Sequence, residues 1–108
     1  MIGGRDFVVN APWDAAARTL VEGMLREHWP SMVADDDTDA GEHYFYRDEL
    51  SWDSWNRDGL TDENDDAMLC VIAGGEQFTL VTSTDPASFT AGIGEELVRK
   101  LGGREVRG

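Results

Sequence analysis

The sequence predicts an α+β fold, in which a small, mostly antiparallel sheet of about four strands carries two amphipathic helices on one face. Three patterns lead to this prediction. Short runs of β-branched and aromatic residues are typical of strands, two longer stretches repeat apolar residues at helical spacing, and a Gly-Gly pair separates two β-rich runs. The expected order is β-α-β-β-β-α. At 108 residues the chain has the length of one domain, so we expect residues 1–108 to form a single domain.

The first two elements are a strand over residues 5–10 and a helix that follows Pro12. Proline suits the first helical position, which places the boundary at Asn10 or Ala11, and Pro30 ends the helix. One face of this helix is apolar because its residues fall three or four apart: Trp13, Ala17, Leu20, Val21, Met24, Leu25 and His28. The opposite face places acids and bases four apart, at Asp14, Arg18, Glu22 and Arg26.

The middle of the chain is harder to interpret. Residues 35–41 hold four aspartates, and their mutual repulsion predicts a solvated loop. Residues 43–47 predict a strand with Tyr44 and Tyr46 on one face and Phe45 on the other. The secondary structure of residues 49–66 is ambiguous from the sequence.

The last third predicts a hairpin and a second helix. The runs 68–72 and 77–83 flank the Gly-Gly turn, and Asp85-Pro86 is a plausible helix start. Apolar residues at intervals of four then follow, and Gly102-Gly103 ends the helix. Because Gly92 and Gly94 are poor helix formers, we expect its first half to fray or to begin later. With both helices on one face, the other sheet face is left free for a partner.

Charge is concentrated in the middle of the chain. The net charge is −13, and residues 35–66 hold thirteen acids against Arg47 and Arg57, whereas residues 1–34 and 67–108 are each close to neutral. Salt-loving organisms also make acidic proteins, but that adaptation coats the whole surface. We therefore interpret the acidic segment as a local feature that serves binding.

The sequence also predicts the compartment. The longest apolar run, residues 67–73, is too short for a bilayer span, and a charge pair at residues 5–6 interrupts any signal-peptide pattern. Cys70 lies in that apolar run, which predicts a buried, reduced thiol. We expect a cytoplasmic protein that does not interact with membranes.

No pattern points to catalysis. His28 and His43 lie far apart, no serine or cysteine accompanies His43 as a nucleophile, and Gly92-Ile93-Gly94 lacks the strand and third glycine of a nucleotide-binding turn. A basic patch for nucleic acid is absent from the sequence. We expect no enzymatic activity, no metal and no cofactor.

One segment matches a calcium-binding pattern in part. Residues 54–65 place Asn56, Asp58, Gly59, Asp62 and Asp65 at the third, fifth, sixth, ninth and twelfth positions of an EF-hand-type or dockerin-type loop. The first position is Ser54 rather than an acid, and the sequence that follows predicts a strand rather than a helix. A calcium-binding module stays an alternative.

Aromatic residues within the acidic segment are the strongest indication of a binding site. Two interpretations stay open: these rings cap the core beneath a long loop, or they anchor an interface that the surrounding carboxylates help a cationic partner to reach. A solvated loop seldom needs two tryptophans, which favours the interface. The predicted partner-binding residues are Tyr44, Tyr46, Trp52, Trp55, Asp58, Asp62, Glu63, Asp65 and Asp66.

In size, charge concentration and order of elements, the whole chain resembles bacterial toxin-immunity proteins of contact-dependent and polymorphic toxin systems. No motif specific to a family carries the resemblance, so no family's binding residues are transferred. The resemblance implies that the protein neutralises a basic, nuclease-type toxin by covering its active site, without itself binding nucleic acid. Alternatives are a phage-type DNA mimic that inhibits a defence complex, a secretion chaperone, and a calcium-binding module or small hydrolase. The sequence leaves the oligomeric state undetermined.

Overall fold

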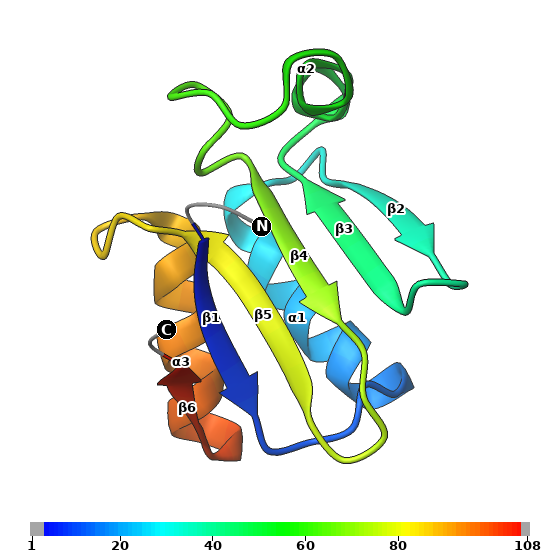
Figure 1. Cartoon of the computed structure of the whole chain (residues 1–108), viewed down its shortest axis with the longest axis vertical. Coiled ribbons are helices and arrows are strands. Elements are labelled where there is room, and N and C mark those ends of the chain that lie inside the picture. The colour runs from blue at the N-terminus through cyan, green and yellow to red at the C-terminus, as the bar shows by residue number, and fades with distance from the viewer. Residues whose placement is uncertain (1–3, 107–108) are drawn as a thin grey trace.

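The fold consists of one antiparallel sheet of six strands with the spatial order β2-β3-β4-β5-β1-β6, together with three helices (Figure 1). The computed structural model describes residues 4–106. The α+β class is confirmed, but four strands and two helices were too few. The elements are β1 (Gly4–Val9), α1 (Ala15–His28), β2 (Val33–Asp37), β3 (Glu42–Tyr46), α2 (Glu49–Asp58), β4 (Met68–Ile72), β5 (Phe78–Ser83), α3 (Phe89–Leu101) and β6 (Gly103–Val106).

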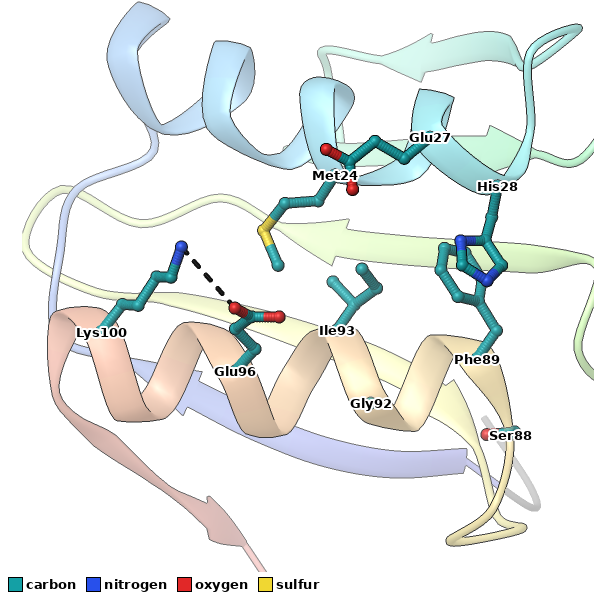
Figure 2. Close-up of a pocket in the computed structure, with 9 residues that line it drawn as sticks. All are labelled: Met24, Glu27, His28, Ser88, Phe89, Gly92, Ile93, Glu96 and Lys100. Carbon is teal, nitrogen blue, oxygen red and sulfur yellow. Dashed lines mark ion pairs between the residues drawn. The ribbon is translucent and has the colours of Figure 1, made fainter.

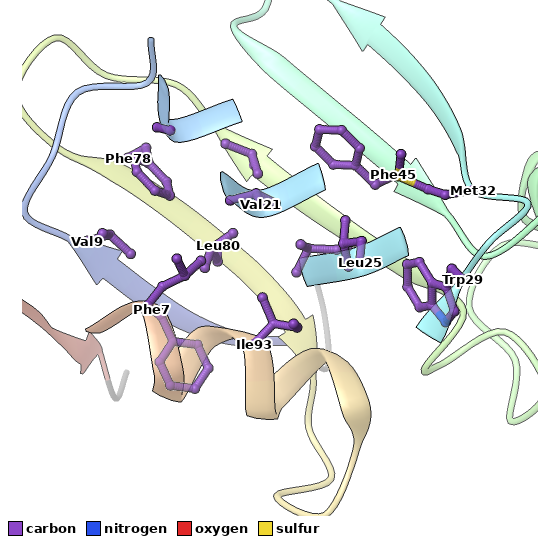
Figure 3. Close-up of a cluster of buried hydrophobic side chains, with 14 residues drawn as sticks. Phe7, Val9, Val21, Leu25, Trp29, Met32, Phe45, Phe78, Leu80 and Ile93 are labelled. Carbon is purple, nitrogen blue, oxygen red and sulfur yellow. The ribbon is translucent and has the colours of Figure 1, made fainter. Parts of the chain in front are cut away.

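Helices α1 and α3 lie on the same face of the sheet, as the sequence predicts (Figure 1). The core forms between these helices and the sheet (Figure 3). Leu25 of α1 and Leu97 of α3 are fully buried there, together with Phe45 and Leu80 of the sheet. None of the helices in the described part of the chain is long and apolar enough to cross a membrane.

Both helices on this face begin later than the proline signals indicated. The carboxylate of Asp14 accepts a hydrogen bond from the backbone N–H of Ala17 and caps α1, so Pro12 lies before the helix. Ser88 caps α3 by accepting from Ala91 N–H, and Asp85-Pro86 likewise lies in the preceding loop. In both helices the start is therefore set by the capping side chain, whose oxygen accepts a hydrogen bond from a backbone N–H of the first turn, and not by the proline.

The prediction that residues 35–41 form a loop was wrong for residues 35–37, because Val33–Asp37 is an edge strand paired with β3, whereas residues 38–41 form the turn between the two strands. The alternation of a strand turns Asp35 and Asp37 to one face and Asp36 to the other, which separates the charges. At an edge every carboxylate reaches water, and all three aspartates are exposed. Gly41, with φ at 69°, completes the turn into β3.

The ambiguous segment contains α2, and a strand that the sequence did not predict follows α3. Asp48 caps α2 by accepting from Ser51 N–H, and the helix ends at Gly59, whose φ is 70°. β6 pairs with β1, which makes it the second edge of the sheet. Gly103 allows this pairing because a side chain there would collide with the carbonyl oxygen of Val8.

The second face of the sheet carries α2 at one end and is otherwise uncovered by helices (Figure 1). We call it the open face. Because Phe45, Leu69 and Leu80 point into the core, their neighbours along each strand point to the open face. Those neighbours include Tyr44 and Tyr46 of β3, Met68, Cys70 and Ile72 of β4, and Thr79 and Val81 of β5.

We predict opposite effects on stability for two glycines that lie two residues apart in α3. A Cβ at Gly94 would lie 2.8 Å from Cγ of Phe7, a buried ring, whereas a Cβ at Gly92 would meet no atom within 4 Å. Gly94→Ala should lower the free energy of unfolding by about 1–3 kcal/mol through overpacking. Gly92→Ala should raise it by up to about 1 kcal/mol because alanine favours the helix. Urea denaturation of both variants measures the difference, and a stabilising Gly94→Ala would contradict this packing.

Candidate partner-binding site

Two tryptophans attach α2 to the open face. Trp52 and Trp55 pack with Tyr44 against a second apolar cluster on that face, made of Tyr46, Met68, Cys70 and Val81. Each of these four residues has no more than 7% of its surface exposed. The rings therefore cover part of the sheet, and both indoles are themselves half-buried.

Hydrogen bonds fix the orientation of both indoles. Nε1 of Trp52 donates to the Asp35 carboxylate at 2.9 Å, which ties α2 to the edge strand β2. Nε1 of Trp55 donates to the carbonyl oxygen of Asn64 at 2.9 Å, and Nδ2 of Asn64 donates to the Gly59 carbonyl at 2.9 Å. Trp55 therefore secures the loop after α2, whereas Trp52 holds α2 beside β2.

This groove runs along the β2–β3 hairpin beside α2 and has a volume of about 570 Å³. Tyr44 and Tyr46 contribute two stacked rings with centroids 6.4 Å apart, and Asn56 contributes from α2. We call it the acidic groove. Its lining consists of Asp35, Asp36, Asp37, Thr38, Asp39, Tyr44, Tyr46 and Asn56.

The charges of the groove are largely uncompensated by the protein itself. Among the described residues, the ion pairs of the acidic segment involve Asp36, Asp48, Asp53 and Asp58. Asp35, Asp37 and Asp39 have no ion pair with any described residue. Asp35 accepts the Trp52 hydrogen bond, and Asp37 accepts one from Ala40 N–H in the hairpin turn. The groove therefore presents three exposed carboxylates that attract a cation.

Asp36 differs from its neighbours because it points to the helix-covered face. Its Oδ1 accepts from Arg18 at 3.1 Å and lies 2.9 Å from Nδ1 of His43. Partial burial acts to raise the pKa of Asp36, but the hydrogen bonds from His43 and Arg18 outweigh it and lower the pKa. Asp36 thus links α1 to the edge of the sheet.

The two tyrosines are uncharged surfaces at neutral pH. Burial raises the pKa of Tyr44, and the nearby Cys70 and Glu42 raise it further. Burial also raises the pKa of Tyr46, with Asp35 contributing. Neutral aromatic faces beside carboxylates are a favourable environment for a guanidinium or ammonium group.

The remaining predicted binding residues lie in other places. Asp58, Asp62 and Glu63 are exposed at the end of α2 and in the following loop, outside the lining of the acidic groove. Asp65 accepts a hydrogen bond from the Ser83 hydroxyl. Asp66 accepts from the backbone N–H groups of Phe89 and Thr90 at the start of α3. Asp65 and Asp66 therefore hold the loop against β5 and α3.

The other chemical candidates of the sequence occupy structural positions. The Cys70 thiol is buried, which raises its pKa to about 12 and leaves it a poor nucleophile. His28 stacks on Phe89 with centroids 4.3 Å apart. Residues 54–58 of the calcium-like pattern belong to α2 and therefore cannot wrap around an ion as such a loop does. Within residues 4–106, no three acidic, histidine or cysteine side chains are grouped to hold a metal.

A second groove of about 470 Å³ lies between α1 and α3. Figure 2 shows Met24 and Ile93 facing the space between the helices, with His28 over Phe89 at one end. Glu96 pairs with Lys100 across one turn of α3. Because both signs of charge line this groove, it has less preference for a charged partner than the acidic groove.

Of the residues that line the groove, the sequence singled out Tyr44 and Tyr46 but not Asp35, Asp37, Asp39 or Asn56. Asp35 and Asp37 reach the groove because residues 33–37 form a strand, which the loop prediction excluded, and Asp39 follows in the turn. A hairpin could have been predicted from two features of the sequence. Turn residues precede Gly41, and the strand pattern of residues 43–47 follows it.

Comparisons with models of known protein families, with curated proteins and with solved structures found no match.

We predict that the free energy of unfolding depends on pH through Asp48, the residue that caps α2. Hydrogen bonding to Ser51 lowers the pKa of Asp48 below its ordinary value of 3.8. A lowered carboxyl pKa stabilises the fold above the unfolded-state pKa, and this contribution is lost as pH falls through the folded-state pKa. The free energy of unfolding should therefore be steady above about pH 5 and decline below about pH 4.

The variant Asp48→Asn tests this attribution because asparagine keeps the cap but does not titrate. Its unfolding free energy, measured by urea denaturation between pH 3 and pH 7, should decline less steeply than that of the parent chain. Identical pH profiles would show that Asp48 does not contribute.

Proposed function

We propose that this chain is a non-enzymatic acidic binding protein that neutralises a basic protein partner by covering its cationic surface. The acidic groove carries the proposal, because three carboxylates that have no ion pair with any described residue stand beside the half-buried ring of Tyr44, which stacks on the buried Tyr46. Aromatic anchors supply affinity when they are covered, and surrounding charges accelerate encounter with an oppositely charged partner.

The distribution of ion pairs on the helix-covered side supports a one-sided surface. There two glutamates are each matched by two bases: Glu22 contacts Arg18 and Arg26, and Glu96 contacts Arg99 and Lys100. A nucleic-acid mimic would spread unmatched carboxylates over much of its surface. The local concentration favours a single basic partner over mimicry of a duplex.

Among proteins that bind a basic partner, a toxin-immunity protein is the class we favour. Nuclease toxins hold phosphate groups with lysine and arginine, so their active sites attract a carboxylate-lined surface. On this proposal the protein acts in the bacterial cytoplasm without a cofactor. The partner to test is then any toxin-domain protein that is encoded beside this chain's gene.

The central prediction is that the groove carboxylates set the rate of association. The variant Asp35→Asn/Asp37→Asn/Asp39→Asn should bind that neighbouring protein about tenfold more slowly at low salt, and the difference should shrink as salt screens the charges. Stopped-flow tryptophan fluorescence across a salt series measures both rates.

A variant with the same loss of charge outside the groove is the control: Glu49→Gln/Asp62→Asn/Glu63→Gln. It should slow association much less than the groove variant. If both variants slowed association equally, the attraction of the partner would come from the acidic segment as a whole and not from the groove. Absence of any salt-dependent binding to the neighbouring protein would contradict the proposed function.

A further inference from the structure

The strand β4 is apolar on both of its faces. Leu69 and Val71 point into the core, whereas Met68, Cys70 and Ile72 point to the open face. A strand with one solvated face normally alternates apolar and polar residues, so apolar side chains on both faces indicate cover on both sides.

Helix α2 supplies this cover for part of β4. Met68 and Cys70 are each 5% exposed beneath the tryptophans, but Ile72 at the far end of the strand is 41% exposed. Within the described chain, the apolar residues that β4 turns to the open face are therefore covered at Met68 and Cys70 but exposed at Ile72.

The strand register places Ile72 in a row that crosses the whole open face. Glu42 and Thr79 are its partners on β3 and β5, and Val8 follows on β1 beside Thr79. The outer positions are charged, with Asp37 on β2 and Arg104 on β6. We call these six residues the lower row: Asp37, Glu42, Ile72, Thr79, Val8 and Arg104.

The lower row is continuous with the acidic groove, because Asp37 belongs to both. Adjacent strands lie about 4.8 Å apart, so Ile72 is about 10 Å from the strand that carries Asp37. A short extended segment of a partner therefore reaches both surfaces at once.

We propose that the lower row is the apolar half of the partner-binding surface, and that the basic partner places an apolar side chain on Ile72 and Val8 while a cationic side chain enters the acidic groove. This inference rests on the proposed function and adds the class of partner segment, an extended one in which a basic and an apolar residue lie two positions apart and so point to the same face. Charge complementarity selects this occupant over a second copy of the chain. On the open face, Asp6, Asp35, Asp37 and Glu42 outnumber Arg104 among the described residues, so two copies repel each other.

Two synthetic peptides of equal charge test the inference. One has eight residues in which arginine and valine take turns at every second position with serine between them, so that both point to the same face, and the other replaces each valine with serine. Isothermal titration calorimetry should show that the parent chain binds the valine peptide about fivefold more tightly, because part of a valine side chain is buried on Ile72 and Val8.

The variant Ile72→Thr keeps a β-branched residue in the strand but removes apolar surface. It should bind both peptides with nearly equal affinity, whereas Leu60→Thr, at a residue that is 47% exposed in the loop after α2, should keep the fivefold preference. The groove variant Asp35→Asn/Asp37→Asn/Asp39→Asn should weaken both peptides by the same factor.

The outcomes separate the two proposals. If the parent chain binds both peptides equally, or if Ile72→Thr keeps the preference, the lower row is not part of the surface and the proposed function stands. If neither peptide binds, this inference fails, and the proposed function is decided separately by salt-dependent binding of the neighbouring protein. A dimer in light scattering that Ile72→Thr disperses would assign the lower row to a second copy and overturn the inference.

Discussion

The packing of Trp52 and Trp55 on the open face is the interaction on which the candidate site depends. These rings cover the apolar residues that β3, β4 and β5 place outside the core, and they attach α2, which has few other contacts with the sheet. Without them, Met68 and Cys70 would be exposed and the acidic groove would lose the wall that contains Asn56. Their hydrogen bonds to Asp35 and Asn64 determine where that wall stands.

The acidic segment folds despite its charge because its carboxylates have different partners. The segment divides its carboxylates among different tasks, which keeps most of them apart. Asp48 caps α2 and Asp66 caps α3, Asp36 binds Arg18, and Asp35 orients Trp52. Among the carboxylates that have no ion pair with a described residue, Asp35, Asp37 and Asp39 lie together at the β2–β3 hairpin beside Tyr44, whereas Glu49, Asp62 and Glu63 lie on α2 and in the loop after it.

The sequence was sufficient to predict the parts of the fold that hydrophobic periodicity determines. The first strand, the helix that ends near Pro30, the 68–83 hairpin and the buried Cys70 are confirmed, because each depends on local patterns of apolar residues and turns. β2 could not be predicted in this way. Its aspartates are unfavourable in most strands, and they are tolerated because the strand lies at the edge and Arg18 comes from a distant helix. The role of Asp66 could not be predicted either, because it accepts a hydrogen bond from the backbone N–H of Phe89, 23 residues away in the sequence.

Chemical-shift mapping is the most direct test of the account, using a ¹⁵N-labelled chain titrated with the eight-residue arginine–valine peptide. The account predicts that the largest amide shifts fall in residues 35–46, at Asn56 and at Ile72, on one side of the sheet. Shifts centred instead on the groove between α1 and α3, at residues 24–28 and 88–100, would contradict it.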